Sequence, residues 1–112
     1  MDREKFDKII KKRKFWNQFQ EADPESMDKI WEDLTELLSE DINDTIKFMK
    51  NDINGTEFIW ISEVFYEIAD KTQSKEFINI LYEIAKKFPK ETDEHYILRS
   101  IEFAEEFIED EE

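Results

Sequence analysis

Apolar residues recur three and four positions apart along nearly the whole 112-residue chain, which is the spacing of one face of an α-helix. The chain holds one glycine and two prolines, too few turn-forming residues for an all-β domain. The pattern therefore predicts an all-α fold of about six short amphipathic helices. Their expected ranges are 2–20, 24–38, 41–52, 57–71, 75–88 and 93–109.

Local signals set these boundaries. Asp23 is a favoured N-cap residue, and Pro24 suits the first helical position that follows it. Gly55 is expected to end the third helix in the left-handed conformation, with Thr56 capping the fourth. The other expected caps and stops are Ser74, Pro89 and Thr92.

Short links between these helices predict how they pack. Connections of two to five residues place sequential helices side by side as antiparallel hairpins. We therefore expect a single domain over 1–112, either an irregular bundle or a short HEAT-like stack. The acidic residues at 109–112 are expected to form a solvated, frayed tail.

Composition supports a folded protein of the cytoplasm. Hydrophobic residues make up 39% of the chain and aromatic residues 14%, enough to build a core despite the high charge. The absence of cysteine excludes disulfides and thiolate metal sites, and it suits a reducing compartment. The charged N-terminus is unlike a signal peptide, and no run of apolar residues is long enough to span a membrane.

The charge of the chain is strongly negative. Thirty acids against sixteen bases give a net charge of −14. Residues 1–20 hold seven bases and three acids, so the rest of the chain is more acidic still. We expect the basic first helix to pair in part with this acidic body. Such a field repels nucleic acid and anionic lipid, and it accelerates encounter with a cationic protein.

Catalytic and metal-binding motifs are missing from the sequence. With His95 as the single histidine and no cysteine, zinc, thiol and His-based triad mechanisms lack parts. Residues 41–52 only superficially resemble a calcium loop, because Ile46 stands where glycine is needed and Asp52 where glutamate belongs. The sequence therefore predicts no enzyme, no cofactor and no metal. Hydrolysis by convergent carboxylates is the enzymatic alternative that stays open.

One face of the predicted helix 57–71 combines a large aromatic residue with acids. Trp60, Glu63, Glu67 and Asp70 follow at spacings of three, four and three, and Tyr66 lies at the edge of the row. An aromatic anchor ringed by carboxylates is typical of a surface that binds a basic protein. The alternative is that Trp60 packs against a neighbouring helix beside an ordinary solvated face.

Two other acidic rows compete with this face. One lies on the outside of the predicted helix 24–38 and the other on the predicted helix 93–109. Like charges at these spacings cost a few tenths of a kcal/mol each, so stability alone does not favour them. The rows consist of Asp28, Glu32 and Glu36, and of Glu102, Glu105, Glu106 and Glu109.

Four segments, at 60–69, 71–78, 87–89 and 100–105, resemble small α-helical immunity proteins of bacterial polymorphic and contact-dependent growth inhibition toxin systems. The resemblance covers about half the chain and includes no catalytic motif. It implies a cytoplasmic inhibitor that binds a cognate toxin, in many cases a nuclease with a basic groove. The alternative is a general HEAT-like protein-interaction adaptor, which an apolar cleft would favour. The sequence leaves the oligomeric state open.

Overall fold

The computed structural model describes residues 1–17 and 23–109, and this part of the chain forms eight helices and no strand. The all-α prediction is therefore confirmed, whereas the expected number of six helices is wrong. Residues 18–20 of the first predicted helix and 110–112 of the tail lie outside the described residues. The helices are α1 (Arg3–Asn17), α2 (Pro24–Ser39), α3 (Ile42–Asn51), α4 (Gly55–Ser62), α5 (Phe65–Thr72), α6 (Lys75–Lys87), α7 (Pro89–Glu94) and α8 (Ile97–Glu105).

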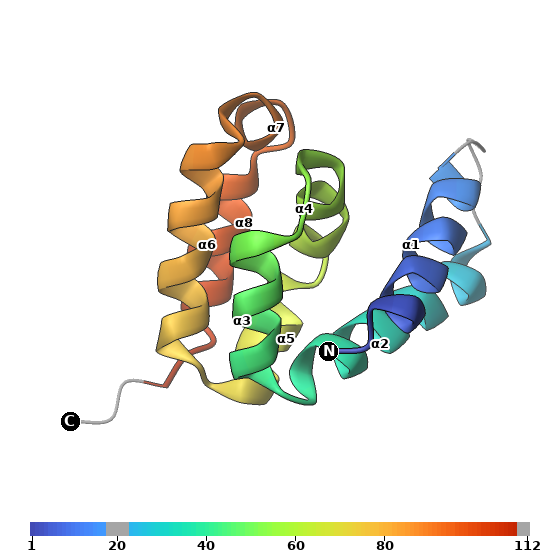
Figure 1. Ribbon diagram of the computed structural model, residues 1–112, viewed down its shortest axis with the longest axis horizontal. Coiled ribbons are helices and arrows are strands. Elements are labelled where there is room, and N and C mark those ends of the chain that lie inside the picture. The colour runs from blue at the N-terminus through green and yellow to red at the C-terminus, as the bar shows by residue number, and fades with distance from the viewer. Residues whose placement is uncertain (18–22, 110–112) are drawn as a thin grey trace.

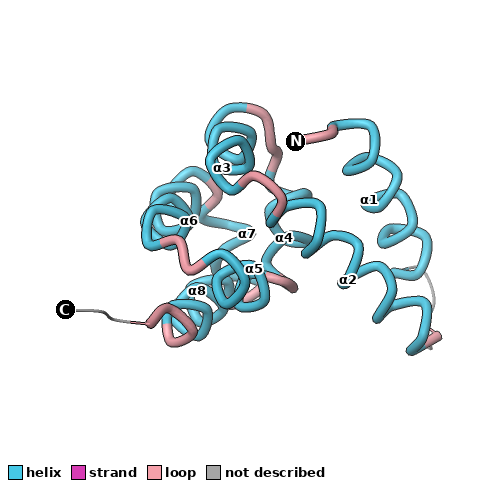
Figure 2. The backbone as a smooth tube through the Cα atoms, turned by 90° about the horizontal axis from the view of Figure 1, so that it is seen from below, coloured by secondary structure: helices cyan, strands magenta, loops and turns pink. Residues whose placement is uncertain are grey.

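The helices divide into a hairpin and a bundle (Figure 1). The antiparallel pair α1 and α2 lies at one end of the longest axis, and Figure 2 shows the same pair standing beside the remaining helices. The C-terminal part of the chain folds back, so that α8 packs against both α5 and α6. Helix α2 joins the two parts because it contacts α1, α3 and α5. None of the described helices is long and apolar enough to cross a membrane.

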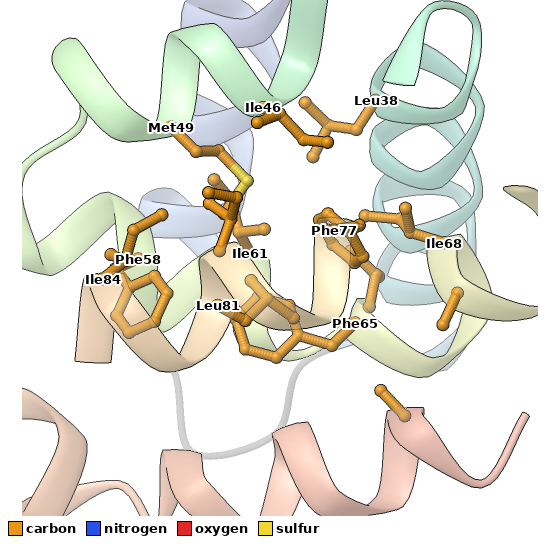
Figure 3. Close-up of a cluster of buried hydrophobic side chains, with 14 of the residues drawn as sticks. Leu38, Ile46, Met49, Phe58, Ile61, Phe65, Ile68, Phe77, Leu81 and Ile84 are labelled. Carbon is orange, nitrogen blue, oxygen red and sulfur yellow. The ribbon is translucent and has the colours of Figure 1, made fainter. Parts of the chain in front are cut away.

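The core lies where α3, α4, α5 and α6 meet (Figure 3). Phe65 is fully buried near its centre, with ring centroids 5.6 Å from Phe58 and 6.2 Å from Phe77. Aromatic pairs at these separations stabilise a core beyond the area that they bury. Fully buried aliphatic side chains from several helices complete the cluster, among them Leu38, Ile61, Ile68, Leu81 and Ile84.

The predicted helix 57–71 is two helices. The backbone turns at Glu63 and Val64, where the amide of Val64 donates to the carbonyl of Ile61 at 2.9 Å. No glycine or proline marks this turn, so the sequence carries no local signal for it. Tertiary packing accounts for it, since α4 packs against α1 and α7 whereas α5 packs against α2 and α6, and both contact α8.

The predicted helix 93–109 begins too late and is not continuous. Residues 89–92, which were expected to link two helices, belong to α7, and α8 begins only at Ile97. Tyr96 takes a left-handed conformation with φ 52°, which is unusual for a bulky residue. Thr92, the expected cap of this helix, is instead buried within α7, and its hydroxyl donates to the carbonyl of Ala85 at 3.2 Å. In a single helix Thr92 and the fully buried Ile97 would point to different sides. The break at Tyr96 allows both side chains to reach the core.

Most other boundaries follow the local signals. Asp23 and Ser74 cap α2 and α6 through their side chains, as predicted. The start of α4 differs, because Asn54 is its cap and forms a reciprocal capping box with Glu57. The prediction for Gly55 is wrong: it is the first residue of α4, and it lies against the carboxylate of Glu91. Thr56 is consequently not the cap.

Candidate functional site

The five predicted binding residues do not form one face. Because the chain turns between α4 and α5, Trp60 and Glu63 face α1, whereas Tyr66, Glu67 and Asp70 lie on α5. The prediction of a single helical stripe is therefore wrong, and each half has a different environment.

Trp60 and Glu63 belong to an internal contact that we call the Arg13 latch, defined by Arg13, Trp31, Trp60 and Glu63. Arg13 donates from Nε and Nη2 to the two carboxylate oxygens of Glu63, each at 2.7 Å. Trp31 Nε1 donates to the same carboxylate at 3.1 Å. The guanidinium carbon of Arg13 lies 4.5 Å from the centre of the Trp60 ring. The latch ties the α1–α2 hairpin to the bundle, so Trp60 and Glu63 take part in an internal contact.

The latch makes a testable contribution to stability. The side chains of Arg13 and Glu63 are 12% and 27% exposed, so loss of Arg13 leaves a largely desolvated carboxylate. We expect Arg13→Ala to lower the free energy of unfolding by about 2 kcal/mol, the range of hydrogen bonds to charged groups. Urea denaturation followed by tryptophan fluorescence measures this. Lys14→Ala, at an exposed position of the same helix, is the control and should have little effect; equal losses would contradict the latch.

Tyr66, Glu67 and Asp70 lie in a surface hollow of about 490 Å³ between α2, α5 and the end of α8. Helix α2 contributes Glu32 and Glu36, two members of the rival acidic row, so the structure merges that row with half of the predicted face. We call this surface the acidic–aromatic hollow. Its lining residues are Glu32, Thr35, Glu36, Tyr66, Glu67, Asp70, Lys71 and Phe107.

Aromatic rings form one wall of the hollow. Tyr66 lies 5.3 Å from Phe107 and 5.4 Å from Phe103, and the two phenylalanines are 5.2 Å apart. Tyr66 is 37% exposed and Phe103 is 50% exposed. Gln73 holds the end of α8 in place, because its side chain donates to the carbonyl of Phe107 at 2.8 Å and accepts from the amide of Glu109 at 2.7 Å. Phe103 and Phe107 were not among the predicted site residues; the exposed Phe103 lies on the side of α8 away from the buried Ile101.

The hollow carries a surplus of negative charge. Four carboxylates, those of Glu32, Glu36, Glu67 and Asp70, line it with the single ammonium group of Lys71. Within the described part of the chain none of the four forms an ion pair; Glu67 accepts a hydrogen bond from the Thr35 hydroxyl at 3.4 Å. Partial burial, together with the adjacent Glu67 carboxylate, raises the pKa of Tyr66 above its usual value. Tyr66 is therefore a neutral phenol at physiological pH.

Some carboxylates outside the hollow form ion pairs with basic residues of α1. Arg3 binds Glu57 at 3.1 Å, so two arginines of α1 pair with the acidic body as expected. His95, the single histidine, is exposed. Across residues 1–17 and 23–109, no group of three histidine, cysteine, aspartate or glutamate side chains is placed to hold a metal ion.

An apolar groove lies at the other end of α8. It has a volume of about 520 Å³ and runs between α6, α7 and α8. Tyr96 at its edge is 69% exposed, and Leu98 is also exposed. Lys86 and Arg99 line the groove, and Arg99 lies 5.8 Å from the centre of the Tyr96 ring. Apolar side chains flanked by cations distinguish this surface from the acidic–aromatic hollow.

Tyr82, which lines the groove, links α6 to α8. Its hydroxyl donates to Glu105 at 2.9 Å, and burial together with this bond raises the pKa of Tyr82 to about 12. The folded state thus holds this proton more tightly than the unfolded chain. The resulting stabilisation should be complete below the ordinary pKa of about 10 and lost as pH rises towards the folded value. Urea denaturation at a series of pH values across this alkaline window measures the effect. The free energy of unfolding should fall more steeply with pH for the native protein than for Tyr82→Phe.

No family model, curated protein or solved structure matches the chain. The fold and its surfaces therefore define the class: a small, acidic, all-α protein with two candidate surfaces of opposite charge.

Proposed function

We propose that the protein is a non-enzymatic inhibitor that binds another protein, and that it acts as a cytoplasmic immunity protein against a toxin domain with a basic surface. The observation that carries this proposal is the acidic–aromatic hollow, in which the exposed Tyr66 ring lies beside four carboxylates that form no ion pair with the described residues. Buried aromatic anchors contribute most to protein interfaces, and surrounding charges steer an oppositely charged partner.

The negative charge of the acidic–aromatic hollow favours a toxin with a basic groove, and nucleases are toxins of this kind. A nuclease groove is built to bind phosphates, and an acidic protein presents a similar potential without a cleavable bond. The same potential opposes binding of nucleic acid or of an anionic membrane by this chain. The resemblance of the segments at 60–69 and 100–105 to immunity proteins points in the same direction.

The genetic neighbourhood tests this proposal first. An immunity protein is expected beside a gene for a large secreted protein that ends in a variable toxin domain, whereas a metabolic operon would count against it. The toxin domain is then expressed with this chain or with the variant Glu67→Lys. The native chain should protect the cells and the variant should protect them poorly. Equal protection by both would remove the hollow from the mechanism.

The apolar groove supports a second candidate function, a HEAT-like adaptor that binds a helical or extended segment of a partner. Tyr96 and Leu98 are its exposed anchors, and the cations Lys86 and Arg99 suit a segment that carries carboxylates. The two functions differ in their response to substitution. Leu98→Ser should abolish binding of an adaptor's ligand and leave toxin inhibition unchanged.

A further inference from the structure

The Arg13 latch shows how this chain binds a guanidinium group. One arginine lies over an aromatic ring at 4.5 Å, and a carboxylate clamps it through two hydrogen bonds of 2.7 Å. The contact combines a cation–π interaction with a bidentate ion pair, and lysine supplies no bidentate fork. The parts are one ring and one carboxylate from neighbouring positions, Trp60 and Glu63.

The acidic–aromatic hollow contains the same parts without the arginine. Tyr66 presents an exposed ring, and the carboxylate of Glu67 lies beside it, held by Thr35 at 3.4 Å. Glu36 of α2 also lines the hollow. Lys71 is the only cation of the lining, and it forms no ion pair within the described residues.

We propose that the hollow binds an arginine side chain of the basic partner, over the Tyr66 ring and clamped by Glu67 and Glu36, in preference to a lysine. This inference rests on the proposed function and specifies its partner. A guanidinium is planar and weakly hydrated, so it stacks on a ring and loses less on leaving water than a compact ammonium does. We expect arginine to bind about tenfold more tightly than lysine at equal charge.

Two peptides test the preference. One consists of four Gly-Arg repeats and the other of four Gly-Lys repeats, each with blocked ends and therefore of equal charge. Isothermal titration calorimetry at low salt measures their affinities, and amide chemical shifts of the full chain locate the site. The arginine peptide should bind about tenfold more tightly and shift the resonances of Tyr66, Glu67 and Phe107.

Variants separate the ring from the charge. Tyr66→Leu should abolish the preference and leave the salt-sensitive binding that both peptides share. Glu67→Gln retains the ring and removes one carboxylate of the clamp. It should lower the affinity for the arginine peptide more than the affinity for the lysine peptide. Tyr96→Leu, at an exposed tyrosine outside the hollow, is the matched control and should preserve the tenfold difference.

The outcomes distinguish the two proposals. If both peptides shift the amide resonances of the hollow and bind with equal affinity, the preference for arginine is wrong and the proposed function stands. If neither peptide binds, or if the shifts fall elsewhere, the hollow does not bind a basic partner, and both the preference and the proposed function are contradicted.

Discussion

Replacing Phe65 with alanine should lower the free energy of unfolding by about 3–5 kcal/mol, the usual cost of removing a buried aromatic ring. Phe65 is fully buried, and its ring packs against Phe58 of α4 and Phe77 of α6. Its loss opens a cavity at the point where three helices meet. Domains of this size have a total stability of only about 5–15 kcal/mol, so the variant should be partly unfolded at moderate temperature. Urea denaturation followed by circular dichroism measures the change.

Phe103→Ala is the matched control for this prediction. Phe103 is half exposed and belongs to the ring cluster of the acidic–aromatic hollow. Its removal should cost about 1–2 kcal/mol of stability, because two aromatic pairs at a half-exposed position are lost. The same substitution should weaken binding of the arginine peptide, because the Tyr66 ring loses a supporting neighbour. Equal stability losses in the two variants would contradict the assignment of Phe65 to the core and Phe103 to the surface.

The sequence predicts the helices of this fold more successfully than the points where they turn. Asp23, Pro24 and Ser74 act as local signals, because a cap satisfies backbone amides within three residues of itself. The turns at Glu63 and Tyr96 have no such signal. Each interrupts a continuous run of helical spacing, and each is stabilised by contacts with helices distant in the sequence. Periodicity alone therefore joined α4 to α5, and it carried the last predicted helix across the turn at Tyr96.

The candidate site depends on the same two turns. Trp60 and Glu63 were predicted to share a face with Tyr66, which requires an unbroken helix, and the turn at Glu63 directs the two residues towards Arg13. Trp60 lies partly buried against the core, with the Arg13 guanidinium of α1 over its ring. Glu32 and Phe107 come from other parts of the chain, and only the tertiary fold brings them beside Tyr66. Acidic spacing on single helices identified Glu32, Glu36, Glu67 and Asp70, with Tyr66 at the edge of one row, but it did not show that the two rows meet in one hollow.

Reversing two charges of the hollow should weaken binding of the arginine peptide strongly. In the double variant Glu67→Lys/Asp70→Lys, two attractive carboxylates become repulsive ammonium groups. Each reversal costs about 1 kcal/mol at the separations and effective dielectric of a protein surface, so that the dissociation constant should rise about 30-fold at low salt. High salt should reduce the difference, because screening shortens the range of exposed charges to about 3 Å at molar ionic strength.

The double variant Glu83→Lys/Glu94→Lys provides the control, because both residues are exposed on α6 and α7 and the change in net charge is identical. Attraction by the whole-molecule charge would make the two double variants equally weak, since both lose the same number of negative charges. Binding in the hollow makes the first variant bind much more weakly than the second, because both reversed charges line the hollow and Glu67 belongs to the proposed clamp. The ratio of the two dissociation constants therefore measures how much of the affinity is local. A ratio near one would assign the acidic surface a general steering role and remove the hollow as the docking site.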